Sequence, residues 1–451
     1  MIESRIDADV STSAPEEKKA TDHVLKTAGT GPLGSSRPEA SGDGRAWLKN
    51  DIVAFFILGN TMALPTTILF TAAHSMFPLF TGTFILALAI SAVVTSLTTR
   101  PILHLLHHNL RIILIFVGSC LAFFICTLGY HIPPGPITGT ITAANVYAFA
   151  TSALLESAAS FDQRTVLAFS MGSGSSVLVG PPLFIGLMRA FNDDWKTVLL
   201  VCISTAVIFP CVWWLMVSKD GREVAEENRR MVAAAKKSKA RGGSTDNSTA
   251  DPEAAIETMT SGFGPERTRL GFFFKVLFPI YVIPQTICTS LSVIALLGVT
   301  PALMYLGVFE ESPKGDLYYQ LSYLVYGIAQ FAFSAASTAR PIPSIWVWAA
   351  LQTALFAISI VQLFEPFLTY YGVWIIFVFL HGGIVGASAT NTNHQIAEDF
   401  RRKGEPEDVR AFALSYGGLG SALGDIIGGG LAIMVQKLVF INMVPVRMPA
   451  P

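Results

Sequence analysis

About eleven apolar segments, each of roughly 20 residues or more, follow one another along this 451-residue chain. A helix needs about 20 consecutive apolar residues to cross the hydrocarbon core of a bilayer, where it must satisfy its own backbone polar groups. The candidate segments are residues 51–73, 77–98, 111–130, 138–158, 165–188, 197–218, 270–297, 317–338, 343–363, 367–390 and 408–436. The pattern predicts an all-α polytopic membrane protein with about eleven transmembrane helices, or twelve if residues 408–445 form two.

Composition supports this class of protein. Charged residues make up 14% of the chain, whereas a soluble protein carries about a quarter. The net charge of −1 gives no indication of a nucleic-acid partner. All five cysteines lie within apolar segments and lack metal-site spacing, so we expect packed thiols and neither a metal nor a cofactor.

A polar stretch divides the apolar segments into two sets. Residues 219–269 are rich in charge, Gly, Ser and Thr, which predicts a disordered cytosolic central loop. It separates a six-helix half, 49–218, from a five-helix half, 270–440. Residues 1–48 are predicted to form a disordered cytosolic tail and residues 441–451 a short C-terminal tail. Two helical halves that rock around a central site are a common plan of solute transporters.

The distribution of Lys and Arg predicts the orientation. With the N-terminus in the cytosol, the cytosolic side receives Arg45, Lys49, Arg100, Arg111, Arg164, the central loop, Arg340, Arg401, Arg402, Lys403 and Arg410. The opposite side receives only Arg189, Lys196, Lys314, Lys437 and Arg447. Because cytosolic loops carry the excess of basic residues, we expect the N-terminus and the central loop to be cytosolic.

The fifth segment contains a run of small residues, Ser170-Met-Gly-Ser-Gly-Ser-Ser176, followed by Gly180-Pro-Pro182. Glycines and hydroxyls allow close helix contact, and prolines free backbone groups that need other partners. Two interpretations remain open at this point. The segment is either a broken helix that lines the substrate pathway, with Ser170, Gly172, Ser173 and Gly174 as lining residues, or a kinked helix that only packs.

The last segment carries one intramembrane carboxylate, Asp425, beside a stripe of glycines. Gly420, Gly424 and Gly428 recur at every fourth position, and such a ridge needs a partner helix. Asp425 is one position further round and therefore faces protein rather than lipid. Intramembrane carboxylates are usually functional, so Asp425 is a candidate proton or cation site; the alternative is a structural ion pair.

Other polar residues form weaker candidates. Asn391-Thr-Asn-His394 ends the tenth segment and is expected either to gate a polar pathway from the cytosolic side or to cap the helix and bind neighbouring backbone. Gln285 is a candidate polar contact in the seventh segment, although an interhelical hydrogen bond is the common role of such a residue.

His104-x-x-His107-His108 has the spacing of one histidine box of membrane desaturases. A di-iron site needs several such boxes, and the other five histidines are scattered singly, so this enzyme is a distant third hypothesis and we expect a non-enzyme. The alternative is that these three histidines belong to a basic turn at the membrane interface and have no catalytic role.

Short collinear motifs resemble the battenin family of membrane proteins. They are Leu58-Gly59, Thr71-Ala-Ala-His74, Ser170-Met-Gly-Ser-Gly174, Tyr281-Val-Ile-Pro-Gln285, Tyr319-Gln320 with Tyr323, the Trp346–Gln352 spacing, Asn391-Thr-x-His394-x-Ile-Ala397, Arg410-x-Phe-Ala413 and Leu423-Gly424. The chain departs from the family pattern at Met62-Ala63, Pro284, Thr289, Phe331 and Ser421, where the family has asparagines, asparagine, glutamate, arginine and aspartate, respectively. It thus resembles a divergent member.

The resemblance implies a major-facilitator-like transporter of the vacuolar or lysosomal membrane, involved in organelle pH homeostasis and moving basic amino acids or glycerophosphodiesters. The expected partners are a small polar solute, protons and the lipid bilayer. The alternative is a non-transporting regulator or scaffold of organelle trafficking that works through its tail and central loop.

Overall fold

The computed structural model describes residues 44–77, 81–103, 105–129, 135–159, 163–223, 226–227, 230, 269–311, 313, 316–340, 342, 344–405, 409, 413, 416 and 418–442. Most of the predicted N-terminal tail, most of the predicted central loop and nearly all of the C-terminal tail lie outside these residues, whereas residues 44–48 of the predicted tail belong to a helix. The chain divides into residues 1–49 and 50–451, and the helical bundle belongs to the second unit.

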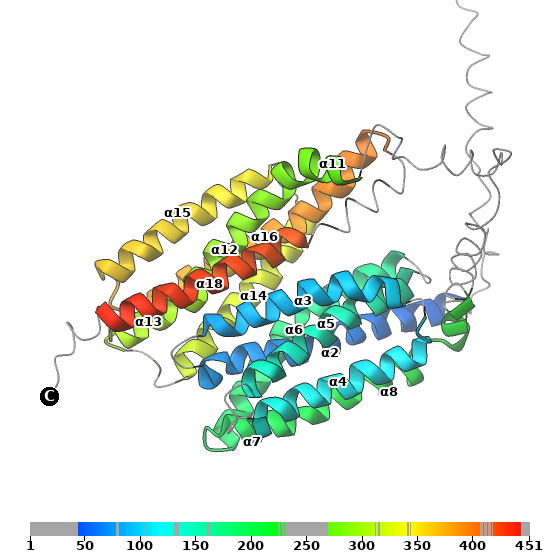
Figure 1. Ribbon diagram of the computed structural model, residues 1–451, viewed down its shortest axis with the longest axis horizontal. Coiled ribbons are helices and arrows are strands. Elements are labelled where there is room, and N and C mark those ends of the chain that lie inside the picture. Colours follow the sequence, from blue (N-terminus) through cyan, green and yellow to red (C-terminus); the bar gives the residue numbers. More distant parts are fainter. Residues whose placement is uncertain are drawn as a thin grey trace, which may run out of the picture. The chain divides into compact units, whose positions relative to one another are not determined.

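The described residues are almost entirely helical, and their helices form two groups (Figure 1). The N-terminal group contains α2 (Gly44–Met76), α3 (Gly82–Leu103), α4 (His108–Leu128), α5 (Gly135–Ala159), α6 (Gln163–Ala190), α7 (Trp195–Cys202), η2 (Ile203–Val207) and α8 (Ile208–Leu215). Helix α5 packs against α3, α4 and α6, and α4 also packs against α7.

The C-terminal group begins with one long, bent helix in several parts. It consists of α11 (Arg269–Phe272), the π-helical η3 (Phe273–Val282), α12 (Ile283–Val293), the π-helical η4 (Ile294–Val299) and α13 (Thr300–Tyr305). It is followed by α14 (Leu317–Ala339), α15 (Ile345–Phe364), α16 (Tyr371–Arg402) and α18 (Leu419–Asn442). Helix α12 packs against α15, α16 and α18, and α14 lies against α16.

Eight helical stretches among the described residues are long and apolar enough to cross a membrane. They are Asn50–Met76, His108–Leu128, Ala168–Ala190, Trp195–Leu215, Phe273–Tyr305, Ile345–Phe364, Tyr371–Arg402 and Leu419–Asn442. The predicted all-helical membrane fold is confirmed, but the count of about eleven spans is not. Helices α3, α5 and α14 belong to the same bundle without meeting this criterion, and the Tyr and Gln residues of α14 lower its hydropathy.

Glycines set the closest helix contacts. A side chain at Gly172 of α6 would meet the Phe56 carbonyl oxygen of α2 at 2.0 Å, so these two helices touch backbone to backbone. The predicted glycine stripe of α18 faces α12, because a side chain at Gly424 would lie 2.6 Å from the Thr289 Cβ atom. Small residues permit this approach where apolar burial gives no driving force between helices.

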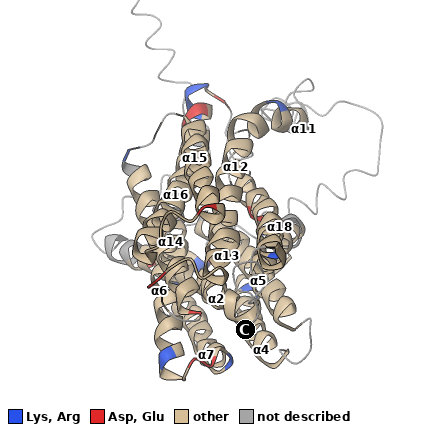
Figure 2. Ribbon diagram, turned by 90° about the vertical axis from the view of Figure 1, so that its left-hand side faces the viewer, with Lys and Arg blue, Asp and Glu red and all other residues tan. Residues whose placement is uncertain are grey.

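The two groups meet where α3 packs against α18, where α6 packs against α14, and where side chains of α2 contact α14. Charged residues lie mainly near the ends of the helices, as around α7 and near α11, and most of each helix between its ends is uncharged (Figure 2). Asp425 is an exception, because it lies inside the apolar span of α18.

Candidate functional site

A cavity of about 290 Å³ lies between the two groups of helices and takes its lining from both; we refer to it as the central cavity. Its lining residues are Thr66, Thr67, Phe70, Ile85, Leu88 and Tyr147 from the N-terminal group and Thr289, Val293, Leu296, Tyr323, Tyr326, Gln330, Val385, Ala389, Ser421 and Asp425 from the C-terminal group. The volume is close to that of small-molecule sites, which begin at about 300 Å³.

Asp425 is the carboxylate of this cavity. The described lining residues include no Lys, Arg or His, so no basic side chain of the lining neutralises it. No hydrogen bond or ion pair joins Asp425 to another described residue. A carboxylate in a low-dielectric cavity without a fixed counter-ion suits either a proton or a cationic group of a solute.

Aromatic rings surround the same space. The Phe70 and Tyr323 rings are stacked with centroids 4.3 Å apart, and they come from different groups of helices. Tyr326 accepts a hydrogen bond from the Ser292 hydroxyl at 3.0 Å, and Tyr147 lines the cavity from α5. Faces of aromatic rings attract cations, so the lining combines an acidic group with rings that favour a positively charged solute.

Gln285 lies beside the cavity, within the C-terminal group, and is fully buried. Its amide nitrogen donates to the Ser421 hydroxyl at 2.9 Å and to the Thr289 hydroxyl at 3.3 Å. Its amide oxygen accepts from the Ser388 and Thr392 hydroxyls, at 2.5 and 3.3 Å. Because Ser421 and Thr289 line the cavity, Gln285 positions two lining residues and joins α12, α16 and α18.

The Ser170–Ser176 run belongs to one continuous helix, α6, which passes through Pro181 and Pro182 without a break. Ser170 and Gly174 are exposed and Ser173 is half-buried, while Gly172 is buried against α2. A side chain at Gly174 would lie 3.8 Å from the Phe331 ring of α14. None of these residues is among the described lining of the central cavity, and close packing accounts for Gly172.

Asn391 and His394 lie on α16, which continues past the predicted end at residue 390 to Arg402. The Asn391 side chain is buried and pairs with the backbone of Ile342, accepting from its N–H at 3.0 Å and donating to its carbonyl at 2.6 Å. This pair holds the connection between α14 and α15. The His394 side chain is exposed, and neither residue is among the described residues that line the central cavity.

Asp425 and Gln330 were predicted from the sequence as cavity residues, whereas Tyr323 stood out only as part of a family motif and most of the other lining residues were not predicted. Tyr323, Tyr326 and Gln330 recur at helical spacing on α14, and this polar stripe on one helix face is the signal that points to a cavity. Thr66, Thr67 and Tyr147 carry no comparable signal, because isolated hydroxyls are common in transmembrane helices.

The central cavity is bounded at one end by contacts between the two groups of helices. His74 of α2 faces Asp316, which immediately precedes α14, with Nε2 and Oδ1 3.9 Å apart. The Ser75 hydroxyl donates to the other oxygen of Asp316. Nearby, the Tyr319 hydroxyl donates to the Phe70 carbonyl at 3.2 Å, and the Gln436 amide donates to the Thr81 hydroxyl at 3.4 Å.

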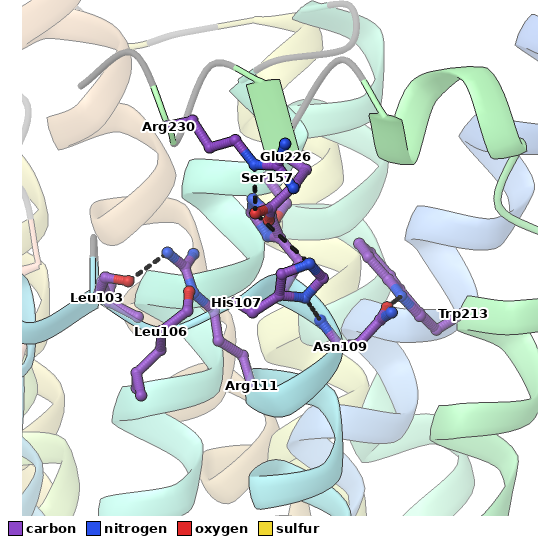
Figure 3. Close-up of polar contacts among 10 residues, drawn as sticks. Leu103, Leu106, His107, Asn109, Arg111, Ser157, Trp213, Glu226 and Arg230 are labelled. Carbon is purple, nitrogen blue, oxygen red and sulfur yellow. Dashed lines mark hydrogen bonds and ion pairs between the residues drawn. The ribbon is translucent and has the colours of Figure 1, made fainter. Parts of the chain in front are cut away.

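Two histidines of the desaturase-like spacing, His107 and His108, contact polar side chains from other parts of the chain, and Figure 3 shows the surroundings of His107. His107 lies 3.5 Å from the Glu226 carboxylate, and its Nδ1 atom accepts from the Asn109 N–H at 3.3 Å. His108 contacts the Ser157 hydroxyl at 2.9 Å. The described residues contain no group of three or more His, Cys, Asp or Glu side chains that could hold a metal ion, and His104 is not among them.

The arrangement of helices is similar to that of known transporters. A D-xylose–proton symporter superposes with a TM-score of 0.53 at 11% identity, covering 87% of this chain and 97% of that one. A bacterial homologue of the human lysosomal transporter Spinster, inward-facing and unoccupied, gives a TM-score of 0.52 at 16% identity, covering 86% and 81%. At these identities the likeness shows the fold alone, and that fold is major-facilitator-like.

Sequence comparison gives the family. Protein BTN1 of Yarrowia lipolytica (strain CLIB 122 / E 150) is 26% identical over 292 residues, a stretch that covers 61% of this chain and 65% of that relative. The family model described as CLN3 protein matches residues 53–440, which is most of the chain. The resemblance predicted from short motifs is therefore confirmed, and this chain belongs to the CLN3, or battenin, family of membrane proteins.

Proposed function

We propose that this chain is a transporter of the vacuolar or lysosomal membrane that moves a small polar solute through the central cavity, with Asp425 as its proton-sensitive carboxylate. The single observation that supports this most strongly is the central cavity itself, which both groups of helices line and which contains one carboxylate. Binding sites between the two halves are the rule in transporters that work by alternating access.

The chemistry of the lining favours a cationic solute over an anionic one. Asp425 supplies a negative charge and Tyr147, Tyr323 and Tyr326 supply ring faces, whereas the described lining has no basic side chain to pair with a phosphate. Basic amino acids fit this lining better than glycerophosphodiesters. This chain has Thr289 and Phe331 where the family pattern has glutamate and arginine. These two differences are consistent with a substrate preference that differs from that of other family members.

The proposed cycle has the first half, residues 51–218, rock against the second, residues 270–436, about the central cavity. Contacts near His74 close the cavity at one end, and the Lys and Arg distribution favours the opposite end as the cytosolic one. Protonation of Asp425 would compete with a cationic solute for the same carboxylate, which couples the two fluxes. Such coupling is the basis for the proposed contribution to vacuolar pH homeostasis.

The test is uptake by proteoliposomes that contain the purified protein, with and without an imposed pH gradient, using labelled lysine or arginine and a glycerophosphodiester. We expect gradient-sensitive uptake of the basic amino acid, and we expect Asp425→Asn to abolish it. Glu365→Gln, at an exposed carboxylate between α15 and α16, is the control and should leave uptake unchanged. Unaltered uptake in the Asp425 variant would remove the carboxylate role, and no uptake by folded protein would contradict the transporter.

A further inference from the structure

An ionisable pair lies outside the central cavity, where α2 meets α14. The His74 side chain is only 4% exposed, and its Nδ1 atom lies 3.3 Å from the Thr81 hydroxyl. Its Nε2 atom faces Asp316 at 3.9 Å, and its ring stacks on Tyr319 with centroids 5.5 Å apart. The imidazole of one group of helices is therefore buried against a carboxylate of the other.

Asp316 gives this pair access to solvent. Its side chain is 36% exposed and lines a cavity of about 370 Å³ that is distinct from the central cavity. Arg189 and Asp193 from the end of α6 and Gln320 of α14 line the same space. A proton can therefore reach the pair from this cavity without passing through the central one.

The pair lies one helical turn beyond the wall of the central cavity on both helices. Phe70 and Tyr323 form that wall, and His74 and Tyr319 follow at four-residue spacing on α2 and α14, toward the Asp316 end. The Tyr319 hydroxyl also binds the Phe70 carbonyl across the two groups of helices. Separation of α2 from α14 at this end must therefore break the His74–Asp316 contact.

We propose that His74 and Asp316 form a proton-binding clasp that holds the two groups of helices together at this end of the central cavity. Its role as a gate depends on the proposed transport function, whereas its effect on the spacing of the helices does not. Protonation of His74 makes the contact a charge pair, and its deprotonation removes the attraction.

The sign of the pH dependence follows from the groups that face the pair. The charge pair requires a protonated imidazole opposite the Asp316 carboxylate, so it is lost when rising pH deprotonates His74. The other groups that face the pair are Thr81, Tyr305 and Gln436, and Arg189 and Asp193 line the cavity beside Asp316. The clasp is therefore stronger at acid pH and weakens as the pH rises.

The experiment measures the distance between the two groups of helices by pulsed electron resonance, with spin labels at Phe191→Cys and Glu311→Cys. Both positions are exposed, and Cys120 and Cys211 are replaced by serine because they are the native cysteines that are not buried. The protein is in nanodiscs without solute, so the result does not depend on transport. Spectra are recorded at about pH 5 and about pH 7.5, so that the pair is compared at an acid and a near-neutral pH.

For the native pair, we expect the ratio of short to long distances to be about two- to fivefold higher at the acid pH, the range of a partly exposed ion pair. Asp316→Asn keeps an acceptor for Ser75 but removes the charge, and it should abolish the pH dependence. His74→Gln should also abolish the pH dependence, and it replaces Asp316→Asn in the test if that variant does not fold. Tyr319→Phe is the matched control, since it removes an uncharged contact and should lower the ratio equally at both pH values.

Two outcomes would overturn the clasp: a native ratio that does not change with pH, or full pH dependence in either charge-removing variant. Gradient-driven uptake with an unchanging distance would leave the proposed transporter intact and dismiss only the clasp. A pH-dependent distance without any uptake would support the clasp and contradict the transporter.

Discussion

Two carboxylates of this protein, Asp425 and Asp316, stand in contrasting surroundings. Asp425 lies within a helix span, lines the central cavity and has no hydrogen bond or ion pair with another described residue. Asp316 precedes a helix, is partly exposed and is bound by His74 and Ser75. A carboxylate without a protein partner is available to a ligand, whereas a carboxylate bound by other side chains fixes the position of helices. Two aspartates of this chain therefore serve two different purposes.

The largest expected effect is a difference in uptake between variants of these two carboxylates. Asp425→Asn should lower gradient-driven uptake by about 100-fold or more, because the proposed cationic solute would lose the carboxylate that pairs with it, and losing one partner of a buried charge pair costs about 3–5 kcal/mol. Asp316→Asn should lower uptake by no more than about fivefold, the effect of a partly exposed ion pair. Initial rates in proteoliposomes of equal protein content measure both. Equal losses in the two variants would contradict the distinction.

The second prediction concerns how α18 presents Asp425 to the cavity. Gly424→Val would place a side chain against Thr289 and the Thr286 carbonyl, where a Cβ atom has only 2.6 and 2.9 Å. Overpacking of this kind costs about 1–3 kcal/mol, so thermal unfolding in detergent should occur at a lower temperature.

Gly430→Val is the matched control on the same helix, because a Cβ atom at Gly430 meets nothing within 4 Å. It should shift the unfolding temperature little. If both variants unfold alike, the glycine stripe does not set the position of α18.

A smaller effect should test the ring faces around Asp425. Tyr323→Leu removes an aromatic face from the cavity lining and should raise the KM for a basic amino acid by about two- to tenfold, in the range of a cation–π contact. Tyr323→Phe keeps the ring and is the control, with an expected KM close to native. Concentration dependence of uptake measures both, and an unchanged KM in the leucine variant would argue against a cationic solute.

The smallest effect concerns a third carboxylate, which belongs to neither region. Asp194 caps α7 and accepts hydrogen bonds from the Thr197 hydroxyl and the Lys196 N–H, which hold its pKa below the usual range. Asp194→Ala should lower stability at neutral pH by about 0.5–1 kcal/mol.

The pH dependence of that loss follows from the lowered pKa. Stabilisation by the charged cap is present above the unfolded pKa of about 3.9 and disappears as the pH falls through the folded value. The difference in unfolding temperature between native protein and Asp194→Ala should therefore shrink between about pH 7 and about pH 3. Asp194→Asn is the control, because it keeps a hydrogen-bond acceptor at the cap. A difference in unfolding temperature between native protein and Asp194→Ala that grows on acidification would contradict this role of Asp194.

Sequence alone determined the class of this protein, because the need to satisfy backbone polar groups in a bilayer imposes long apolar helices. The hydropathy pattern predicted most helices within a few residues, although α16 extends to Arg402 and α18 begins at Leu419 rather than near residue 408. The glycine stripe of α18 predicted a partner helix, which is α12. The sequence predicted about eleven spans, whereas eight described helical stretches are long and apolar enough to cross a membrane; the polar residues that α14 presents to the central cavity lower its hydropathy below that of these stretches.

Only the tertiary structure decided which polar residues meet. Asn391 and Gln285 look alike in the sequence, yet Asn391 binds the Ile342 backbone and Gln285 binds the hydroxyls of two cavity-lining residues. His74 and Asp316 are separated by more than two hundred residues and face each other only because α2 and α14 pack together. A periodic pattern specifies one face of one helix, whereas a site between helices depends on how several faces are rotated against one another, and that is set by packing.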